Sequence, residues 1–268
     1  MKTFFKTMFI TATIGLAVSL NACDTDDDDD NTTPVFPSQS VGINFMHLSG
    51  ADTIELNTSN RPYTNALGQQ YNVTKLRYLI SNVTLHQVNG VNIELDEYFF
   101  VDISKPETFS FTGSRMIPQG TYSGISYTFG FDENDNTDGI YTDLNVANWN
   151  WPTPIGGGYH FMQLEGRYID SNSADQFFAT HMGTARKIDS TGTTFEANHF
   201  TVMIPNSGFV VGIGNSNIEL EFTMNINEWY TNPVNWDFNI YGAGIMPNYN
   251  AQKLLNTNGK DIFTVRMK

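Results

Sequence analysis

Histidine and methionine are the side chains of this protein best suited to hold a metal ion. The sequence contains five histidines and ten methionines but a single cysteine. Imidazole nitrogen and thioether sulfur both bind copper, and thioether sulfur favours copper(I). Structural zinc sites, by contrast, are usually built with two or more thiolates. The composition therefore favours copper over structural zinc as the metal that this chain would bind.

The spacing of the histidines does not define a site by itself. The sequence has no H-E-x-x-H motif and no close histidine pair. The five histidines are His47, His86, His160, His181 and His199. Any metal site must therefore be assembled from distant strands. His47 and His181 each end an apolar stripe, where a histidine is more often a core or rim residue than a ligand.

The richest stretch of aromatic residues and glycine lies between Trp149 and Tyr168. Trp149 and Trp151 point the same way if the chain is extended there. A Pro/Gly loop with three consecutive glycines follows, and glycine allows a close approach of the backbone that other residues tolerate less easily. The period-two pattern after this loop predicts a strand. The two indoles either cap a sandwich core or lie beside a binding site.

Short segments of alternating apolar and polar residues recur along the chain and predict strands. The clearest are Val41–Leu48, Tyr71–Val88, Val91–Asp102, Thr121–Phe131 and Ile218–Ile226. A parity change near Ser81 indicates a bulge, and Asn89-Gly90 predicts a hairpin turn. Helical spacing appears in 248–258 alone. We expect an all-β fold, a β-sandwich with one short C-terminal helix.

The N-terminal residues predict export. Residues 1–22 have a basic start and an apolar centre, as a lipoprotein signal peptide does, and Cys23 would become the lipidated N-terminus. Ordinary secretion, with Cys23 incidental, is the alternative. Residues 23–40 would form an acidic disordered tether, and 41–268 the folded domain. Acid-rich runs at this position resemble surface-export signals of some Gram-negative lipoproteins. We expect an outer-membrane lipoprotein, anchored in lipid through Cys23, on the cell surface or the periplasmic face.

The formal net charge of −14 excludes some partners. It becomes more negative when the two lysines of the signal peptide are removed. Such a surface repels nucleic acid and anionic membranes, and no basic patch is visible.

Several motifs in the same order resemble the MbnP-like family of copper-binding proteins, found beside methanobactin operons and as bacterial surface lipoproteins. The resemblance covers about Val41 to Val265. The matching motifs are the W-x-W pair with its following G-Y strand, INFMHLSG, TNALGQQYNVTKLRYLISNVTL, YFFVD, FGFDENDN and THMG. The family implies a mononuclear copper held by two histidines, for metal acquisition or handling, with a tryptophan or its oxidation product kynurenine alongside in some members.

Carried over by motif, the resemblance makes His47 and His181 the copper ligands, with Trp149 and Trp151 beside the metal. The sequence departs from the family pattern in four places, each of which removes or moves a potential ligand. These are Phe99 in place of histidine, Ala147 in place of methionine, a longer loop from Trp151 to Gly158, and Met246-Pro247 in place of Met-His. His160 or His199 could compensate, although the spacing selects neither.

A second metal site is suggested by oxygen donors at alternate positions. The residues of this possible calcium loop are Asp132, Asn134, Asn136, Asp138 and Asp143. A polar turn is the alternative, because Asp and Asn often bond to their own backbone.

We find no G-x-S-x-G or comparable catalytic motif, so we expect a binding protein rather than an enzyme. The alternative function is a glycan- or surface-ligand-binding module in which Trp149, Trp151, Trp229 and Trp236 form stacking platforms. A third is a structural surface protein whose metal site is lost. A metal-uptake partner protein is possible, and its identity is unknown.

Overall fold

The structure, a computed structural model, describes residues 38–214 and 217–268. The expected signal peptide, Cys23 and most of the expected tether lie outside these residues. The described residues belong to one compact unit, Phe36–Lys268. Its first strand begins at Ser38, slightly before the expected start of the domain at Val41. Among the described residues, no helix is both long and apolar enough to cross a membrane.

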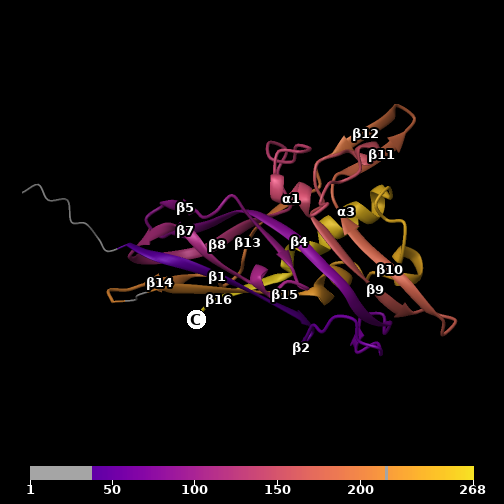
Figure 1. Cartoon of the computed structure of the whole chain (residues 1–268), viewed down its shortest axis with the longest axis horizontal. Helices are drawn as coiled ribbons and strands as arrows, with labels where there is room; N and C mark the ends of the chain where they lie inside the picture. Colours follow the sequence, from indigo (N-terminus) through magenta and orange to yellow (C-terminus); the bar gives the residue numbers. More distant parts are fainter. Residues whose placement is uncertain (1–37, 215–216) are drawn as a thin grey trace, which may run out of the picture. The chain divides into compact units, whose positions relative to one another are not determined.

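Two sheets make up most of this unit (Figure 1). The five-stranded sheet runs in the order β16 (Phe263–Met267), β15 (Ile218–Asn225), β1 (Ser38–Ser49) and β2 (Asp52–Thr53), with β7 (Ser110–Pro118) also paired with β1. β1 and β15 are parallel, and the other pairs in this sheet are antiparallel.

The nine-stranded sheet is antiparallel in all its pairs and is organised around β4. Its main path is β10 (Asp175–Met182), β9 (Met162–Ile169), β4 (Gln70–Gln87), β8 (Gly120–Phe129) and β13 (Phe200–Met203). The shorter strands are β3 (Tyr63–Thr64), β5 (Asn92–Glu94) and β6 (Tyr98–Asp102), which pair with β4, and β14 (Phe209–Val211), which pairs with β8. A separate hairpin consists of β11 (Ala185–Asp189) and β12 (Gly192–Glu196).

Helices are short, and the longest is near the C-terminus. The α-helices are α1 (Thr142–Val146), α2 (Phe238–Tyr241) and α3 (Tyr249–Asn258). The 3-10 helices are η1 (Pro106–Thr108), η2 (Thr153–Ile155), η3 (Ile226–Tyr230) and η4 (Gly259–Asp261). α3 begins after Asn248, whose side chain accepts a hydrogen bond from the Ala251 N–H and so caps the helix. The predicted C-terminal helix is confirmed, and with it the all-β sandwich class.

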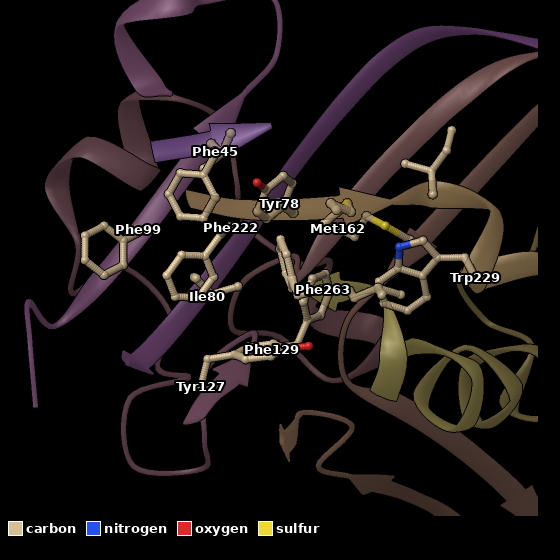
Figure 2. Close-up of a cluster of buried hydrophobic side chains, with 14 of the residues drawn as sticks. Phe45, Tyr78, Ile80, Phe99, Tyr127, Phe129, Met162, Phe222, Trp229 and Phe263 are labelled. Atoms are coloured by element: carbon tan, nitrogen blue, oxygen red, sulfur yellow. The ribbon is translucent and has the colours of Figure 1, made fainter. Parts of the chain in front are cut away.

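Aromatic side chains from both sheets form the core. On β15 the alternating apolar residues predicted from the sequence are buried, Phe222 among them. Phe45 of β1 lies between the sheets, with its ring centroid 5.6 Å from that of Phe222 and 6.0 Å from that of Tyr78 on β4 (Figure 2). The alternation therefore selects one face of each sheet for burial, as a sandwich requires.

β4 carries the irregularity that the sequence indicates near Ser81. The pairing of β4 with β8 shifts register between Ser81 and Thr84, and Asn82 has a φ of 52°. Asparagine tolerates this left-handed conformation better than most residues. The bulge lets one long strand pair with β9 along its first half and with β8 along its second half.

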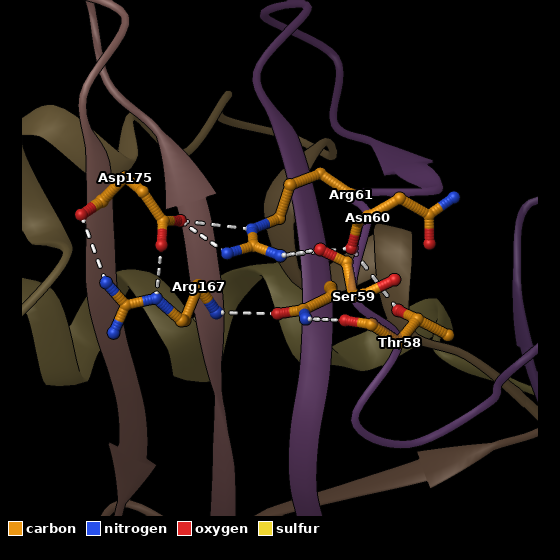
Figure 3. A network of polar contacts seen from close by, with 7 residues as sticks. Thr58, Ser59, Asn60, Arg61, Arg167 and Asp175 are labelled. Carbon is orange, nitrogen blue, oxygen red and sulfur yellow. Dashed lines mark hydrogen bonds and ion pairs between the residues drawn. The ribbon is translucent and has the colours of Figure 1, made fainter.

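A polar network fastens the chain before β3 to the β9–β10 hairpin (Figure 3). Arg61 and Arg167 both donate hydrogen bonds to the Asp175 carboxylate. The Asn72 side chain donates to the Thr58 carbonyl and accepts from the Arg167 N–H. Because much of this network is exposed to solvent, it orients the loop more than it stabilises the fold.

We expect the Phe222→Ala variant to lower the free energy of unfolding by about 3–5 kcal/mol, because it leaves a cavity between the sheets. Phe177→Ala on β10 is the matched control, since Phe177 is 46% exposed. Urea unfolding of both variants measures the difference. Equal losses in the two variants would contradict this account of the core.

Candidate metal site

The candidate site lies on the face of the nine-stranded sheet that points away from the sandwich core. Arg77 on β4, Gln163 on β9 and His181 on β10 are in register across three strands. Neighbouring residues of a strand point to opposite faces. Tyr78, which follows Arg77, points into the core, so Arg77 and the two residues in register with it point outward.

The chain between β8 and β9 packs over this outer face. It contributes a second apolar cluster, in which Leu144 of α1, Trp149 and Tyr159 pack on Leu79 of β4. The Arg77 guanidinium lies 4.8 Å from the ring centroid of Trp149. Arg77 and Leu79 of the outer face are therefore covered rather than exposed to solvent.

His160, near the end of the chain between β8 and β9, and His181 of β10 form a histidine pair. Their ring centroids are 5.4 Å apart. The His160 ring also lies 5.3 Å from that of Trp149 and 5.0 Å from that of Trp151. The structure thus brings together three of the four predicted site residues, namely Trp149, Trp151 and His181, and adds His160 to them.

Hydrogen bonds leave one nitrogen of each histidine available. His160 Nδ1 lies 3.1 Å from the Trp149 carbonyl oxygen, so Nδ1 carries the proton and Nε2 keeps its lone pair. His181 Nε2 lies 2.9 Å from Glu165 Oε1, and by the same reasoning its Nδ1 keeps the lone pair. A histidine whose second nitrogen is anchored by a carbonyl or carboxylate is the usual arrangement around bound metals.

Burial keeps His160 neutral. Burial first, and the neighbouring His181 second, lower the pKa of His160 to about 4. Since a metal binds the deprotonated ring, His160 needs to lose no proton at neutral pH to become a ligand.

Glu165 supplies the negative charge of the site. It accepts hydrogen bonds from His181 and from Lys75, whose Nζ lies 2.8 Å away. These bonds, that from His181 above all, lower the pKa of Glu165 to about 2. The carboxylate therefore stays ionised and fixes the orientation of the His181 ring.

Arg77 holds Trp149 in place. Besides lying over the indole, its guanidinium donates to the Ala147 carbonyl at 2.8 Å. Ala147, where the resemblance implies methionine, contributes a backbone acceptor and no thioether here. The Trp149 Nε1–H is buried without a partner in the described residues.

His47 is not part of this site. Its Nε2 lies 3.0 Å from the Tyr78 hydroxyl, inside the sandwich core. Tyr78 and Arg77 are on opposite faces of β4, so the sheet separates His47 from His181. Two imidazoles that share one metal need their nitrogens within about 4–5 Å, since each bond is near 2 Å. The structure therefore does not bring His47 and His181 together, and places His160 beside His181 instead.

The oxygens of the possible calcium loop bond to the protein itself. Asn136 Oδ1 accepts from the Tyr159 N–H, and Asp138 Oδ1 accepts from the Gly158 N–H. Asp132 Oδ1 accepts a hydrogen bond from the Asn134 N–H, as expected for a polar turn. Asp143 accepts a hydrogen bond from the Tyr98 hydroxyl. No group of three or more His, Cys, Asp or Glu side chains suited to a metal is found in the described part of the chain.

The glycine loop sets the position of His160. Gly158 has a φ of +81°, and a Cβ added there would lie 2.4 Å from Asn136 Oδ1. Glycine is needed both for this backbone conformation and for this close approach. The loop was recognisable in the sequence, but its conformation, which decides where His160 points, was not.

We expect the Glu165→Gln variant to lose stability in a pH-dependent way. Because the pKa of Glu165 is lowered in the folded state, the stabilisation is present above its ordinary value of 4.5 and disappears as the pH falls towards about 2. The difference in unfolding free energy between wild type and variant should therefore shrink over this interval. Glu55→Gln, at an exposed residue, is the control, and a difference independent of pH would speak against the Glu165 assignment.

Comparisons with known proteins agree with this architecture. The family model for MbnP matches residues 38–247, more than half of the chain. MbnP from Methylosinus trichosporium, a solved structure, is similar with a TM-score of 0.55 and 13% identity, over 86% of this chain and 99% of that one. At this identity the likeness shows a shared fold. None of the curated proteins matches the chain. The family match establishes that the chain belongs to the MbnP family.

Proposed function

We propose that this protein binds one copper ion through His160 Nε2 and His181 Nδ1, with Trp149 and Trp151 beside the metal. The observation that carries the proposal is the histidine pair, in which the second nitrogen of each ring is already anchored. Membership of the MbnP family, which is consistent with copper handling, supports the same metal.

The donor set suits copper(I). Two neutral imidazoles without a thiolate form a site of low coordination number, and copper tops the affinity order for nitrogen ligands. The two tryptophans are at most 1% exposed and pack against the ring of His160. A bound copper ion would supply Lewis acidity and one-electron chemistry, while Glu165 and the Trp149 carbonyl orient the rings that hold it.

The cellular role that fits is acquisition or handling of copper outside the cytoplasm. We propose that Cys23 is lipidated and anchors the protein to the outer membrane, with the acidic tether joining the anchor to the domain. We propose further that the protein hands its copper to a separate uptake protein and catalyses no reaction of its own.

The glycan-binding alternative gains no support from the tryptophans. Trp149, Trp151, Trp229 and Trp236 are all at most 1% exposed. A sugar-stacking platform needs aromatic faces open to solvent, so these four side chains do not form one.

We expect the His160→Ala/His181→Ala double variant of a chain beginning at Asp24 to lose copper(I) binding. That chain contains the whole compact unit. Competition with a chromogenic copper(I) chelator measures the affinity, and circular dichroism checks the fold. His86→Ala, on β4 away from the pair, is the matched control and should bind like wild type.

A His47→Ala arm separates the two ligand assignments. If His47→Ala loses copper(I) binding and His160→Ala retains it, the assignment of His160 as a ligand is wrong. The pairing of His47 with His181, inferred from the sequence, would then be restored. Absence of copper binding by the wild-type protein would refute the proposed function itself.

Glu165→Gln should weaken copper binding by about 10–100-fold, the usual effect of removing a residue that orients a metal-bound histidine. The measurement is the same competition assay. An unchanged affinity would show that His181 does not need Glu165 to hold its orientation.

A further inference from the structure

A cavity opens beside β1, on the side of the nine-stranded sheet opposite to the candidate metal site. Its volume is about 670 Å³, within the usual range of about 300–1,000 Å³ for small-molecule sites. β7 pairs with β1 as far as Asn44, and β2 pairs with it from Leu48. Phe45–His47 lie between these two partners, and the cavity is lined by residues from both flanks, including Thr53 and Ser110.

The cavity is mainly apolar. Its apolar lining includes Phe45, Met46, Ile54, Leu56, Ile103 and Phe109. His47 and Glu221 are the two buried polar residues of the wall, at 5% and 3% exposure, and the His47 ring centroid lies 5.3 Å from that of Phe109. The other polar residues of the lining lie nearer to solvent. A cavity with mainly apolar walls and a few polar side chains is the usual form of a site for a small organic ligand.

The hydrogen bond to Tyr78 sets the protonation of His47. The Tyr78 hydroxyl is buried, and His47 Nε2 is its one hydrogen-bond partner in the described part of the chain. A buried hydroxyl without an acceptor is costly, so Tyr78 donates its hydrogen to Nε2. The proton of the neutral ring then lies on Nδ1, which has no partner among the described residues. Nδ1–H is the polar group that His47 offers to the cavity.

We propose that this cavity binds a neutral, mainly apolar molecule bearing a carbonyl group, whose oxygen accepts a hydrogen bond from the His47 Nδ1–H. The apolar walls bury the body of the ligand, and the His47 Nδ1–H binds its carbonyl oxygen. The site is distinct from the copper site because β4 separates them, His47 lying with Tyr78 and the histidine pair lying with Arg77.

Charges near the cavity favour a neutral ligand. Glu221 in its lining is paired with Lys268 and Arg266, each at 2.6 Å. Burial lowers the pKa of His47 to about 4, so its ring carries no charge at neutral pH. A cationic ligand would therefore lose its hydration without meeting an unpaired negative charge, which favours a neutral ligand over a cation.

The test uses prodan, a neutral naphthyl ketone whose fluorescence reports the polarity around it, and the chain beginning at Asp24 without copper. We expect saturable binding with a blue shift of emission. Acetonaphthone should displace the probe about 10-fold more effectively than ethylnaphthalene, which lacks the carbonyl, since one hydrogen bond is worth about 1.4 kcal/mol at most.

Two variants locate the site. Thr53→Trp fills the mouth of the cavity from an exposed strand residue and should reduce prodan affinity at least 10-fold, whereas Thr194→Trp on the exposed strand β12 should not. His47→Phe should abolish the advantage of acetonaphthone over ethylnaphthalene. If His47→Phe does not fold, the Thr53 and Thr194 variants still decide the location.

No saturable binding by the wild-type chain, or equal affinities in Thr53→Trp and wild type, would overturn the proposal. Equal displacement by acetonaphthone and ethylnaphthalene would overturn the carbonyl specificity. Copper binding by the His160–His181 pair is measured separately, so neither result depends on the other.

Discussion

The register between β4 and β9 is the constraint on which the two sites depend. It sets Arg77 beside Gln163 and Tyr78 beside Met162. Because adjacent residues point to opposite faces, one step along β4 moves from the outer site to the sandwich core. A slip of one residue would exchange the two environments and place a guanidinium among the core aromatics. The same register that buries Tyr78 in the core places Gln163 and His181 on the outer face. The burial of Tyr78 therefore helps to fix the position of His181.

Around the histidine pair, most polar groups have assigned partners. Glu165 is held by Lys75 as well as by His181, and Asn136 and Asp138 hold the backbone of the glycine loop. Such anchoring matters in a covered site, where a polar group without a partner is costly. The buried indole N–H of Trp149 and the Nε–H of Arg77 are exceptions in this part of the described structure. The Trp149 ring adjoins that of His160, so its indole N–H is an unused donor close to the pair.

Much of the fold was predictable because alternation and turn signals are local. The bulge near Ser81, the turn at Asn89-Gly90 and the helix after Asn248 all follow from short stretches of sequence. Trp149, Trp151 and His181 were singled out through motifs that resemble the family, and the structure places all three around His160. His160 was not selected, because its direction depends on the positive φ of Gly158 and on a distant asparagine. The structure does not bring His47 and His181 together, which the motifs could not reveal because they give the order of residues along the chain but not the face of the sheet.

The parallel pairing of β1 with β15 has a consequence for the order of folding. β1 joins residues about 175 positions later in the chain, as Asn44 does with Glu219. Closing so long a loop costs entropy that must be lost before the contacts form. β2 and β7 can pair with one edge of β1 early, but its other edge waits for β15 until nearly the whole chain is present. A protein built in this way benefits from a chaperone that protects this open edge during synthesis.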